Sequence, residues 1–301
     1  MSLTLKKLID RYRDDPDSAF PNLHYQVRAK HGRLLARISH EHGHHPLRNV
    51  RTRTLVVWYK AWLADGKVAM AHALFSRLRV VFRFGATMLE DRDCDRLLDA
   101  VGDIRLQTSR SDTLQMTIEQ ANDIRGVAKQ KGMFSMAIAQ ALQFELLMSQ
   151  KDVIGEWLPS SEPGDSGTTR EKKGKWLRGL RWECIDENLI LRHTVGKSRR
   201  RIEVDLRTAP MVLEELGTSD RHTLPTSGPM IICETTGYPY STAEFRRKWR
   251  IVAKLAGVPD NVKNRDSTPP GMIVGGAGRA RISQTITPQM INYSLRMLRK
   301  K

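Results

Sequence analysis

The strongest constraint on the fold is a change of hydrophobic period along the chain. In the first hundred residues, apolar side chains recur at three- and four-residue spacing in segments that Gly and Pro separate, which predicts helices. We place these helices at Leu3–Tyr12, Tyr25–His40, Thr52–Asp65, Lys67–Gly85 and Asp91–Val101. This part of the chain is therefore expected to form a compact helical bundle.

A polar stretch follows the predicted bundle. Residues 104–113 have no clear apolar period, so we expect a helical domain over residues 1–106, a linker over 107–112 and a second domain over 113–301. In the second domain Thr117 and Gln120 have the spacing of a capping box, which predicts a helix start. The apolar run Met133–Met148 predicts a buried helix.

Strand-like patterns begin near residue 176. The runs Trp176–Trp182, Asn188–His193 and Arg201–Leu206 are separated by turn residues, which predicts a small antiparallel sheet of three strands. Residues 160–175 are rich in Ser, Gly and Lys and predict a mobile loop. Helical patterns return at Thr208–Glu215, Thr242–Ala256 and Thr287–Arg299. The expected fold class is mainly α with a small antiparallel β-sheet, in two domains.

The charge balance indicates a polyanionic partner. Fifty Lys and Arg residues against 33 Asp and Glu residues give a formal net charge of +17, spread along the whole chain. Such an excess is typical of proteins that bind nucleic acid, although a ribosomal or simply basic protein with a solvated surface is the alternative. The cations of the first domain expected to line a duplex backbone are Arg48, Arg51, Arg53, Lys60, Arg77, Arg79 and Arg83.

Other site classes receive little support from the sequence. The three cysteines are far apart and lack CxxC spacing, which argues against a disulfide framework or a zinc ribbon. The histidines of residues 40–46 lie in a turn with Gly and Pro, and no second cluster supplies further ligands, so we expect no metal site. No apolar run approaches the roughly 18 residues of a membrane span. We expect a cytoplasmic, nucleoid-associated protein without a membrane segment or signal peptide.

The order of these parts resembles the tyrosine recombinase, or phage integrase, family. The local segments that carry the resemblance are Ala139–Leu146, Gln150–Trp157, Gly228–Ile232, Thr236–Tyr240, Phe245–Arg250 and Ala256–Pro259. Together they look like integrases of alpha-proteobacterial type. The resemblance implies a helical core-binding domain and an α+β catalytic-type domain that hold duplex DNA as a C-shaped clamp.

The resemblance also implies a chemistry and its residues. In the family a tyrosine hydroxyl attacks a DNA phosphodiester without metal or nucleotide cofactor. Two arginines clamp the anionic phosphorane, and a lysine in a strand turn protonates the leaving oxygen. Tyr293 matches the nucleophile and Lys197 the general acid, with Lys175 and Arg199 as alternatives for the lysine. The competing interpretation of Tyr293 is ordinary packing on an amphipathic helix. The competing interpretation of Lys197 is that its turn binds DNA without taking part in catalysis. The cations of the second domain expected to contact DNA are Lys197, Arg199, Arg200, Arg246 and Arg247.

Three positions depart from the family pattern. Ser149 and Thr268 stand where the two clamp arginines are expected, and Gln284 stands where an assisting His or Trp is expected. A serine cannot clamp a phosphorane, and each 1.36 kcal/mol lost in the transition state slows cleavage tenfold. These departures imply little or no autonomous strand cleavage.

Three functions therefore remain open. The first is a degenerate recombinase that serves as a DNA-binding, architectural or regulatory protein. The second is an active recombinase whose clamp is rebuilt by Arg265, Arg279 or Arg281, or is completed by another copy or by an active relative on the DNA. The third is a protein that binds RNA or another partner through a coarsely similar fold.

Overall fold

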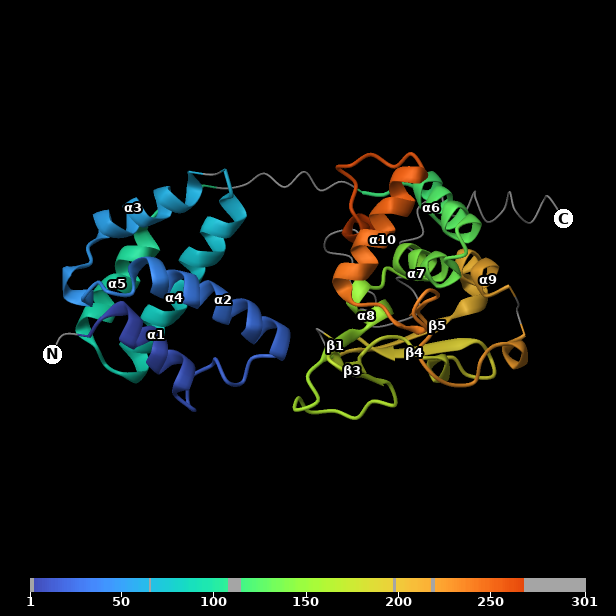
Figure 1. The fold of residues 1–301 in the computed structure, drawn as a ribbon, viewed down its shortest axis with the longest axis horizontal. Coiled ribbons are helices and arrows are strands. Elements are labelled where there is room, and N and C mark those ends of the chain that lie inside the picture. The colour runs from blue at the N-terminus through green and yellow to red at the C-terminus, as the bar shows by residue number, and fades with distance from the viewer. Residues whose placement is uncertain (1–2, 65, 108–114, 197–198, 218–219, 268–301) are drawn as a thin grey trace. The chain divides into compact units, whose positions relative to one another are not determined.

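The structure is a computed structural model that describes residues 3–64, 66–107, 115–196, 199–217 and 220–267 (Figure 1). The chain divides into two compact units, residues 1–111 and residues 112–301. Each unit contains a hydrophobic core of its own. Of the expected elements, the helix at Thr287–Arg299 lies outside the described residues.

The first unit is the expected helical bundle. It consists of α1 (Leu5–Asp14), α2 (Tyr25–His42), η1 (Leu47–Asn49), α3 (Thr52–Leu63), α4 (Val68–Met88) and α5 (Arg92–Asp103). The helix α1 begins later than the apolar period suggests, because Thr4 is its N-cap and accepts a hydrogen bond from the Lys7 N–H at 3.4 Å. Gly85 lets α5 approach α4 closely, since a Cβ there would lie 2.3 Å from Cys94 Sγ.

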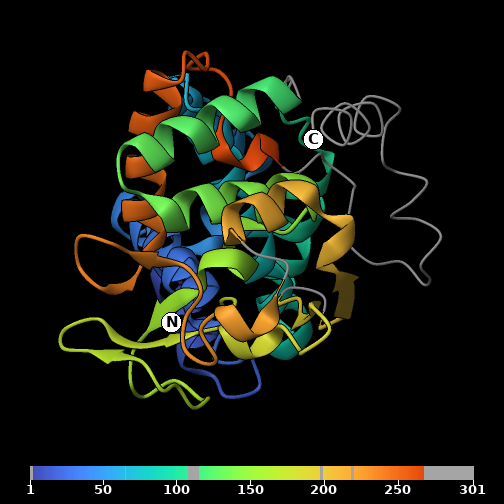
Figure 2. The same ribbon diagram turned by 90° about the vertical axis from the view of Figure 1, so that its right-hand side faces the viewer.

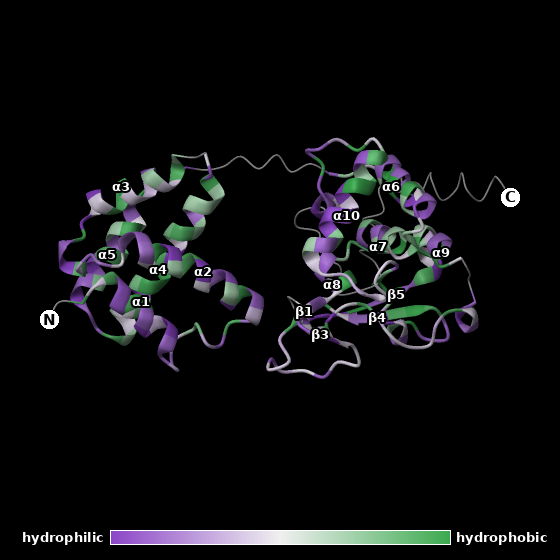
Figure 3. Ribbon diagram, in the orientation of Figure 1, coloured by the Kyte–Doolittle hydropathy of each residue, from purple (hydrophilic) through white to green (hydrophobic). Residues whose placement is uncertain are grey.

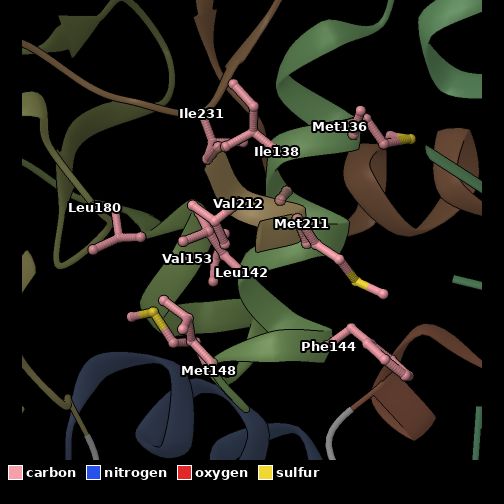
Figure 4. Packing of buried hydrophobic residues seen from close by; sticks show 14 of the residues in the cluster. Met136, Ile138, Leu142, Phe144, Met148, Val153, Leu180, Met211, Val212 and Ile231 are labelled. Atoms are coloured by element: carbon pink, nitrogen blue, oxygen red, sulfur yellow. The ribbon is translucent and has the colours of Figure 1, made fainter. Parts of the chain in front are cut away.

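The second unit places a buried helix at its centre. Its helices are α6 (Ile118–Gln130), α7 (Phe134–Glu145), α8 (Gln150–Ile154), α9 (Pro210–Leu216) and α10 (Thr242–Leu255). The helix α7 packs against both α6 and α9 (Figure 2). Its Ile138 and Leu142 meet Val153 and Val212 in the core (Figure 4). The predicted capping box is present, with Thr117 and Gln120 exchanging side-chain to backbone hydrogen bonds of 3.1 and 3.2 Å.

The predicted antiparallel pairing of β4 (Ile190–Thr194) with β5 (Arg201–Asp205) is present, but the run from Trp176 belongs to a different sheet. The strands β1 (Glu156–Leu158), β2 (Thr169–Arg170) and β3 (Gly174–Leu177) form one antiparallel sheet in the order β1-β3-β2. The strands β4 and β5 pair separately, as do β6 (Ile232–Cys233) and β7 (Tyr238–Pro239). The run from Trp176 does not continue to Trp182, because Arg178 adopts a left-handed φ of 68° and breaks the strand. The stretch 160–175, expected to be a loop, contains β2.

Short 3-10 turns connect the remaining elements. They are η2 (Trp182–Cys184), η3 (Leu206–Thr208), η4 (Arg221–Thr223) and η5 (Asn264–Ser267). In Figure 3 the helix α10 carries hydrophilic as well as hydrophobic residues, as expected of a helix with one face on the core and one in water. Within the described part of the chain, no helix combines the length and apolarity needed to cross a bilayer.

Candidate functional site

Ser149 caps a short helix at the position where the resemblance expects the first clamp arginine. Its Oγ accepts a hydrogen bond from the Asp152 N–H at 3.2 Å and donates one to Asp152 Oδ2 at 2.6 Å. The residue has the extended backbone of an N-cap, with φ −68° and ψ 150°. The hydroxyl is thus engaged in starting α8, and it brings no positive charge to the site.

Asp152 ties α8 to the turn that follows β4. Its Oδ1 accepts a hydrogen bond from the Gly196 N–H at 2.7 Å, and His193 Nε2 lies 3.6 Å from the same oxygen. The side chains of His193 and Asp152 are only 7% and 8% exposed. One buried carboxylate therefore fixes the end of α8, the strand β4 and Gly196, which directly precedes Lys197.

The buried pair is charged at neutral pH. Burial by itself would lower the pKa of His193, but the Asp152 carboxylate and the neighbouring Cys184 raise it to about 9. Burial would raise the pKa of Asp152, but the nearby His193 ring and the hydrogen bonds from Ser149 and Gly196 hold it below its usual range. The pKa of Cys184 is lowered, because the nearby His193 outweighs the effect of burial. An imidazolium–carboxylate ion pair thus lies beneath the turn between β4 and β5.

The turn itself presents positive charge. The Arg199 N–H donates to the Val195 carbonyl at 2.9 Å, and the Val195 N–H donates to the Arg200 carbonyl at 2.8 Å. Arg199 is exposed and has a left-handed φ of 57°, whereas Arg200 is half-buried. The expected general acid, Lys197, lies outside the described residues. Its alternative Lys175 belongs to β3 and pairs with Leu158 and Thr169 in the other sheet.

A second group of charges surrounds Glu156, whose side chain is fully buried. Lys151 Nζ lies 2.9 Å from Glu156 Oε2, and an Arg178 guanidinium nitrogen lies 2.6 Å from Oε1. The side chains of these cations are 44% and 30% exposed. A Cβ added to Gly196 would lie 3.9 Å from Arg178 Cδ, so Arg178 lies beside the turn. Arg178 is not among the residues predicted from the sequence to contact DNA, and its only local signal there is the Gly179 that follows.

The second clamp position lies just beyond the described residues. Ser267, the last described residue, is buried, and its Oγ accepts from Gln140 Nε2 at 3.1 Å, while Gln140 Oε1 accepts from Trp249 Nε1 at 2.8 Å. Arg265, proposed as a displaced clamp, has a side chain that is 77% exposed. Four other candidate residues also lie outside the described residues, namely Tyr293, Gln284, Arg279 and Arg281, together with Thr268 itself.

The cations predicted for the first unit divide into two groups. Arg77 donates to His31 Nδ1 at 2.9 Å, and Arg79 donates to the Val101 carbonyl at 3.2 Å, so both are engaged inside the bundle. Burial lowers the pKa of Arg77. The exposed members of the set are Arg48, Arg51, Arg53, Lys60 and Arg83. In the second unit Arg246 and Arg247 are exposed on α10, and Arg246 donates to Gln150 at 3.2 Å.

The histidine-rich turn packs against aromatic side chains. The His42 ring stacks on Trp58 with centroids 4.1 Å apart, and the His44 and His45 rings lie 4.1 Å apart. Burial lowers the pKa values of His42 and His45, which favours neutral rings. Among the described residues, no group of three His, Cys, Asp or Glu side chains is arranged to hold a metal ion.

A surface pocket near η4 is poorly suited to a phosphate. It is lined by Asp186 and Glu187 together with Arg221 and other residues of η4. The Arg221 guanidinium donates to the carbonyls of Ile185, Trp182 and Leu224 at 2.9 to 3.3 Å. Three of its five N–H donors are thus already used, and the two acidic residues would repel an anion.

No protein-family model and no curated protein sequence matches the chain. Several solved structures do resemble it. A lambda integrase dimer bound to a COC′ core site has a TM-score of 0.65 and 15% sequence identity, covering 88% of this chain and 87% of that chain. A lambda integrase tetramer bound to a Holliday junction has a TM-score of 0.63 and 15% identity, covering 89% of this chain and 68% of that chain.

A transposon protein gives the widest coverage of these examples. The Tn1549 transposon integrase in complex with circular intermediate DNA has a TM-score of 0.59 and 12% identity, covering 98% of this chain and 99% of that chain. The match thus covers nearly the whole chain, including both units. The chain has the fold of the lambda and Tn1549 integrases, which is the fold that the resemblance to tyrosine recombinases implied.

Proposed function

We propose that this protein binds duplex DNA and is deficient in strand cleavage, so that it acts as a DNA-binding, architectural or regulatory protein. The fold is shared with integrases whose structures contain DNA. The net charge of +17 supports a polyanionic ligand. The exposed cations of both units, such as Arg51, Arg53 and Arg247, supply contacts for a phosphate backbone.

The proposed cleavage deficiency rests on the role of Ser149 in the structure. Its hydroxyl bonds Asp152 and caps α8, and no positive charge is present at this position. A phosphorane gains stabilisation from donors placed where its charge develops, and removing one such donor typically costs about 3 to 4 kcal/mol. That loss corresponds to a rate decrease of about two to three powers of ten. The Thr268 substitution is expected to add a second loss of this kind.

The first experiment measures binding. The full-length protein is titrated into a labelled duplex made from the DNA that flanks its own coding sequence, at several salt concentrations. We expect retardation of the duplex and an affinity that falls steeply with salt, because counterions are released from the phosphates. Failure to retard any duplex at low salt would refute the DNA-binding proposal.

The second experiment measures cleavage. The protein and a Tyr293→Phe control are incubated with nicked suicide duplexes of the same sequence, which trap a phosphotyrosyl link. We expect no SDS-resistant adduct in either sample. An adduct that disappears in the Tyr293→Phe variant would instead establish an active recombinase, whose clamp is rebuilt by residues such as Arg265 or is completed by a partner. Retardation of an RNA probe without retardation of duplex DNA would favour the third function.

The proposal extends to assembly and location. Lambda integrase has been solved on DNA as a dimer and as a tetramer. By analogy we expect this protein to assemble on its duplex with itself or with an active relative, in the cytoplasm where the nucleoid lies. Light scattering of the protein with and without a duplex carrying two sites measures this: assembly raises the mass of the complex above one protein per duplex.

A further inference from the structure

We propose that Arg178 and Lys151 form a phosphate-binding site beside the β4–β5 turn, which contacts the DNA backbone in place of the arginine that Ser149 replaces. The inference rests on the proposed binding of duplex DNA and names the residues that hold one phosphodiester of it. Neither cation belongs to the set that the sequence analysis expected to touch DNA.

One buried carboxylate, that of Glu156, forms ion pairs with both cations. Glu156 has a fully buried side chain and bonds Lys151 and Arg178 at 2.9 and 2.6 Å. The exposed fractions of the cations, 44% and 30%, show that both reach the surface. One cation would be enough to neutralise Glu156. The second leaves a net positive charge at the surface, held in place by an anchor that solvent does not reach.

This charge lies next to the residues that the family uses for chemistry. Ser149 Oγ bonds Asp152, and Asp152 bonds the Gly196 N–H at 2.7 Å. Gly196 in turn lies beside the Arg178 side chain, since its Cβ position is 3.9 Å from Arg178 Cδ. Arg178 is thus connected to the Ser149 position through Asp152 and Gly196, although the two positions are 29 apart in the sequence.

The strained backbone of Arg178 supports a functional role for this residue. Its φ of 68° lies in the left-handed region, which glycine adopts freely and which costs other residues about 1 kcal/mol or more. The next residue, Gly179, is packed so closely that a Cβ there would lie 2.6 Å from the Gly155 nitrogen. The chain therefore turns sharply at Arg178, and the turn directs its guanidinium to Glu156.

The chemistry of the pair suits a phosphodiester. A guanidinium has five N–H donors in a plane and binds two oxygens of a phosphate at once. The bond to Glu156 uses one nitrogen of Arg178. The remaining donors and the Lys151 ammonium provide charge-assisted hydrogen bonds to an anion at the surface. Without a second arginine opposite them, these contacts bind a backbone phosphate and give no strand cleavage.

The test compares salt dependence in matched variants. Arg178→Met and Lys151→Met each remove one cation, and Arg181→Met is the control, because Arg181 pairs with the exposed Glu183 at 2.9 Å in the same unit. For each full-length protein, the logarithm of the duplex association constant is measured against the logarithm of salt concentration. We expect the slope to become shallower by about 0.9 for each test variant, with binding weakened about five- to tenfold at 0.15 M salt. The control keeps the wild-type slope.

Further outcomes separate the possible failures. A wild-type protein that binds no duplex ends both proposals, whereas wild-type binding with unchanged slopes in both test variants overturns this inference alone. Arg178→Lys keeps the charge and is expected to keep the slope, with a few-fold loss of affinity from the lost bidentate contact. If Arg178→Met lowers the melting temperature so far that it cannot be titrated, Lys151→Met decides, because Lys151 is more exposed and leaves Arg178 on Glu156.

Discussion

His193 carries a positive charge in the interior of the second unit, and this charge makes the stability of the unit depend on pH. The folded pKa of about 9 lies above the unfolded value of about 6.5. The stabilisation by the pair with Asp152 is therefore complete below the unfolded pKa and is lost as pH rises through about 9. The lowered pKa of Asp152 acts at the other end, where stability is lost as pH falls through that lowered value.

The variant His193→Gln tests this ion pair. We expect the wild-type free energy of unfolding to decrease by about 1 to 3 kcal/mol between pH 6.5 and 9.5, and the variant to lose most of that dependence. Urea unfolding followed by tryptophan fluorescence at a series of pH values measures both. Parallel pH profiles for the two proteins would show that His193 is neutral in the folded state.

Glu145, at the end of α7, also contributes stability that is lost as pH rises, but here the ionised form is the unfavourable one. Burial raises its pKa to about 7, although the backbone N–H groups of Val212 and Met211 act to lower it. Because the folded pKa lies above the unfolded one, stability from this group is complete below about 4.5 and is lost as pH rises through 7. The ionised form costs stability at higher pH.

The variant Glu145→Gln removes this charge and keeps an acceptor for the Val212 N–H, which donates to Glu145 at 3.0 Å. We expect the variant to be about as stable as the wild type at pH 5 and more stable by about 1 to 3 kcal/mol at pH 8.5. The difference between the two unfolding free energies across this range is the measurement. If the variant were less stable than the wild type at pH 8.5, the folded protein would stabilise the ionised form of Glu145, contrary to this prediction.

At the scale of single residues, the resemblance predicts that Ser149 stands at a clamp position, whereas the contacts around this residue could not be predicted from the sequence. The absence of an arginine at Ser149 follows from comparison with the family pattern and needs no coordinates. The bond that the Gly196 N–H donates to Asp152 and the approach of Arg178 to the same glycine bring together α8, the end of β3 and the turn after β4. These contacts join positions 18 to 44 residues apart, and no local period encodes them.

The elements α6 and α9 are held together by a buried arginine. Arg125 is 3% exposed and bonds Glu215, which is 2% exposed, at 2.6 Å. It also bonds Glu214 at 2.7 Å and the Met211 carbonyl at 3.3 Å. Lys129 reaches the same two carboxylates from a more exposed place on α6, with 37% of its side chain in solvent.

The pair of variants Arg125→Met and Lys129→Met separates the two contributions. Removing Arg125 leaves Glu215 as a buried charge without its main partner and should cost about 3 to 5 kcal/mol. Removing Lys129 leaves the Arg125 bonds in place and should cost less than about 1 kcal/mol. Thermal and urea unfolding of both full-length variants measure this contrast. Equal effects would contradict the assignment of Arg125 as the main link.

Among the elements, helices could be predicted well and strand partners could not. The helix α10 was expected at Thr242–Ala256 and is found one residue shorter, at Thr242–Leu255. It could be predicted because its apolar stripe and its Ser241 cap are local signals. The strand β1 has three residues, too few to show an alternation, so its pairing with β3 was missed. The left-handed residue Arg178 then ended β3 where the apolar run continued.

For the molecule as a whole, the exposed cations of the first unit predict a measurable share of the DNA affinity. The variant Arg51→Gln/Arg53→Gln removes two exposed charges at the start of α3. We expect the logarithmic salt slope of duplex binding to become shallower by about 1.8, if each side chain meets one phosphate. The control Lys6→Gln removes a cation that pairs with Asp10 at 2.6 Å and should leave the slope unchanged.

The sequence predicts two regions of different pattern, because a polar stretch without apolar period separates them. In the structure the chain divides into compact units over residues 1–111 and 112–301. The cores themselves follow from the apolar stripes of helices such as α4 and α7. The fold of the second unit came from the resemblance and was then found in the lambda and Tn1549 integrases.

Each unit buries a core of its own, and this has a consequence for the history of the protein. Substitutions that erode one core leave the packing of the other in place, so we expect selection to act on the two units separately. A lineage that no longer exchanges strands can therefore accumulate changes at Ser149 and its surroundings while drift in the first unit stays restrained by its own stability. Descendants of a recombinase with this architecture can keep DNA binding after strand cleavage has been lost.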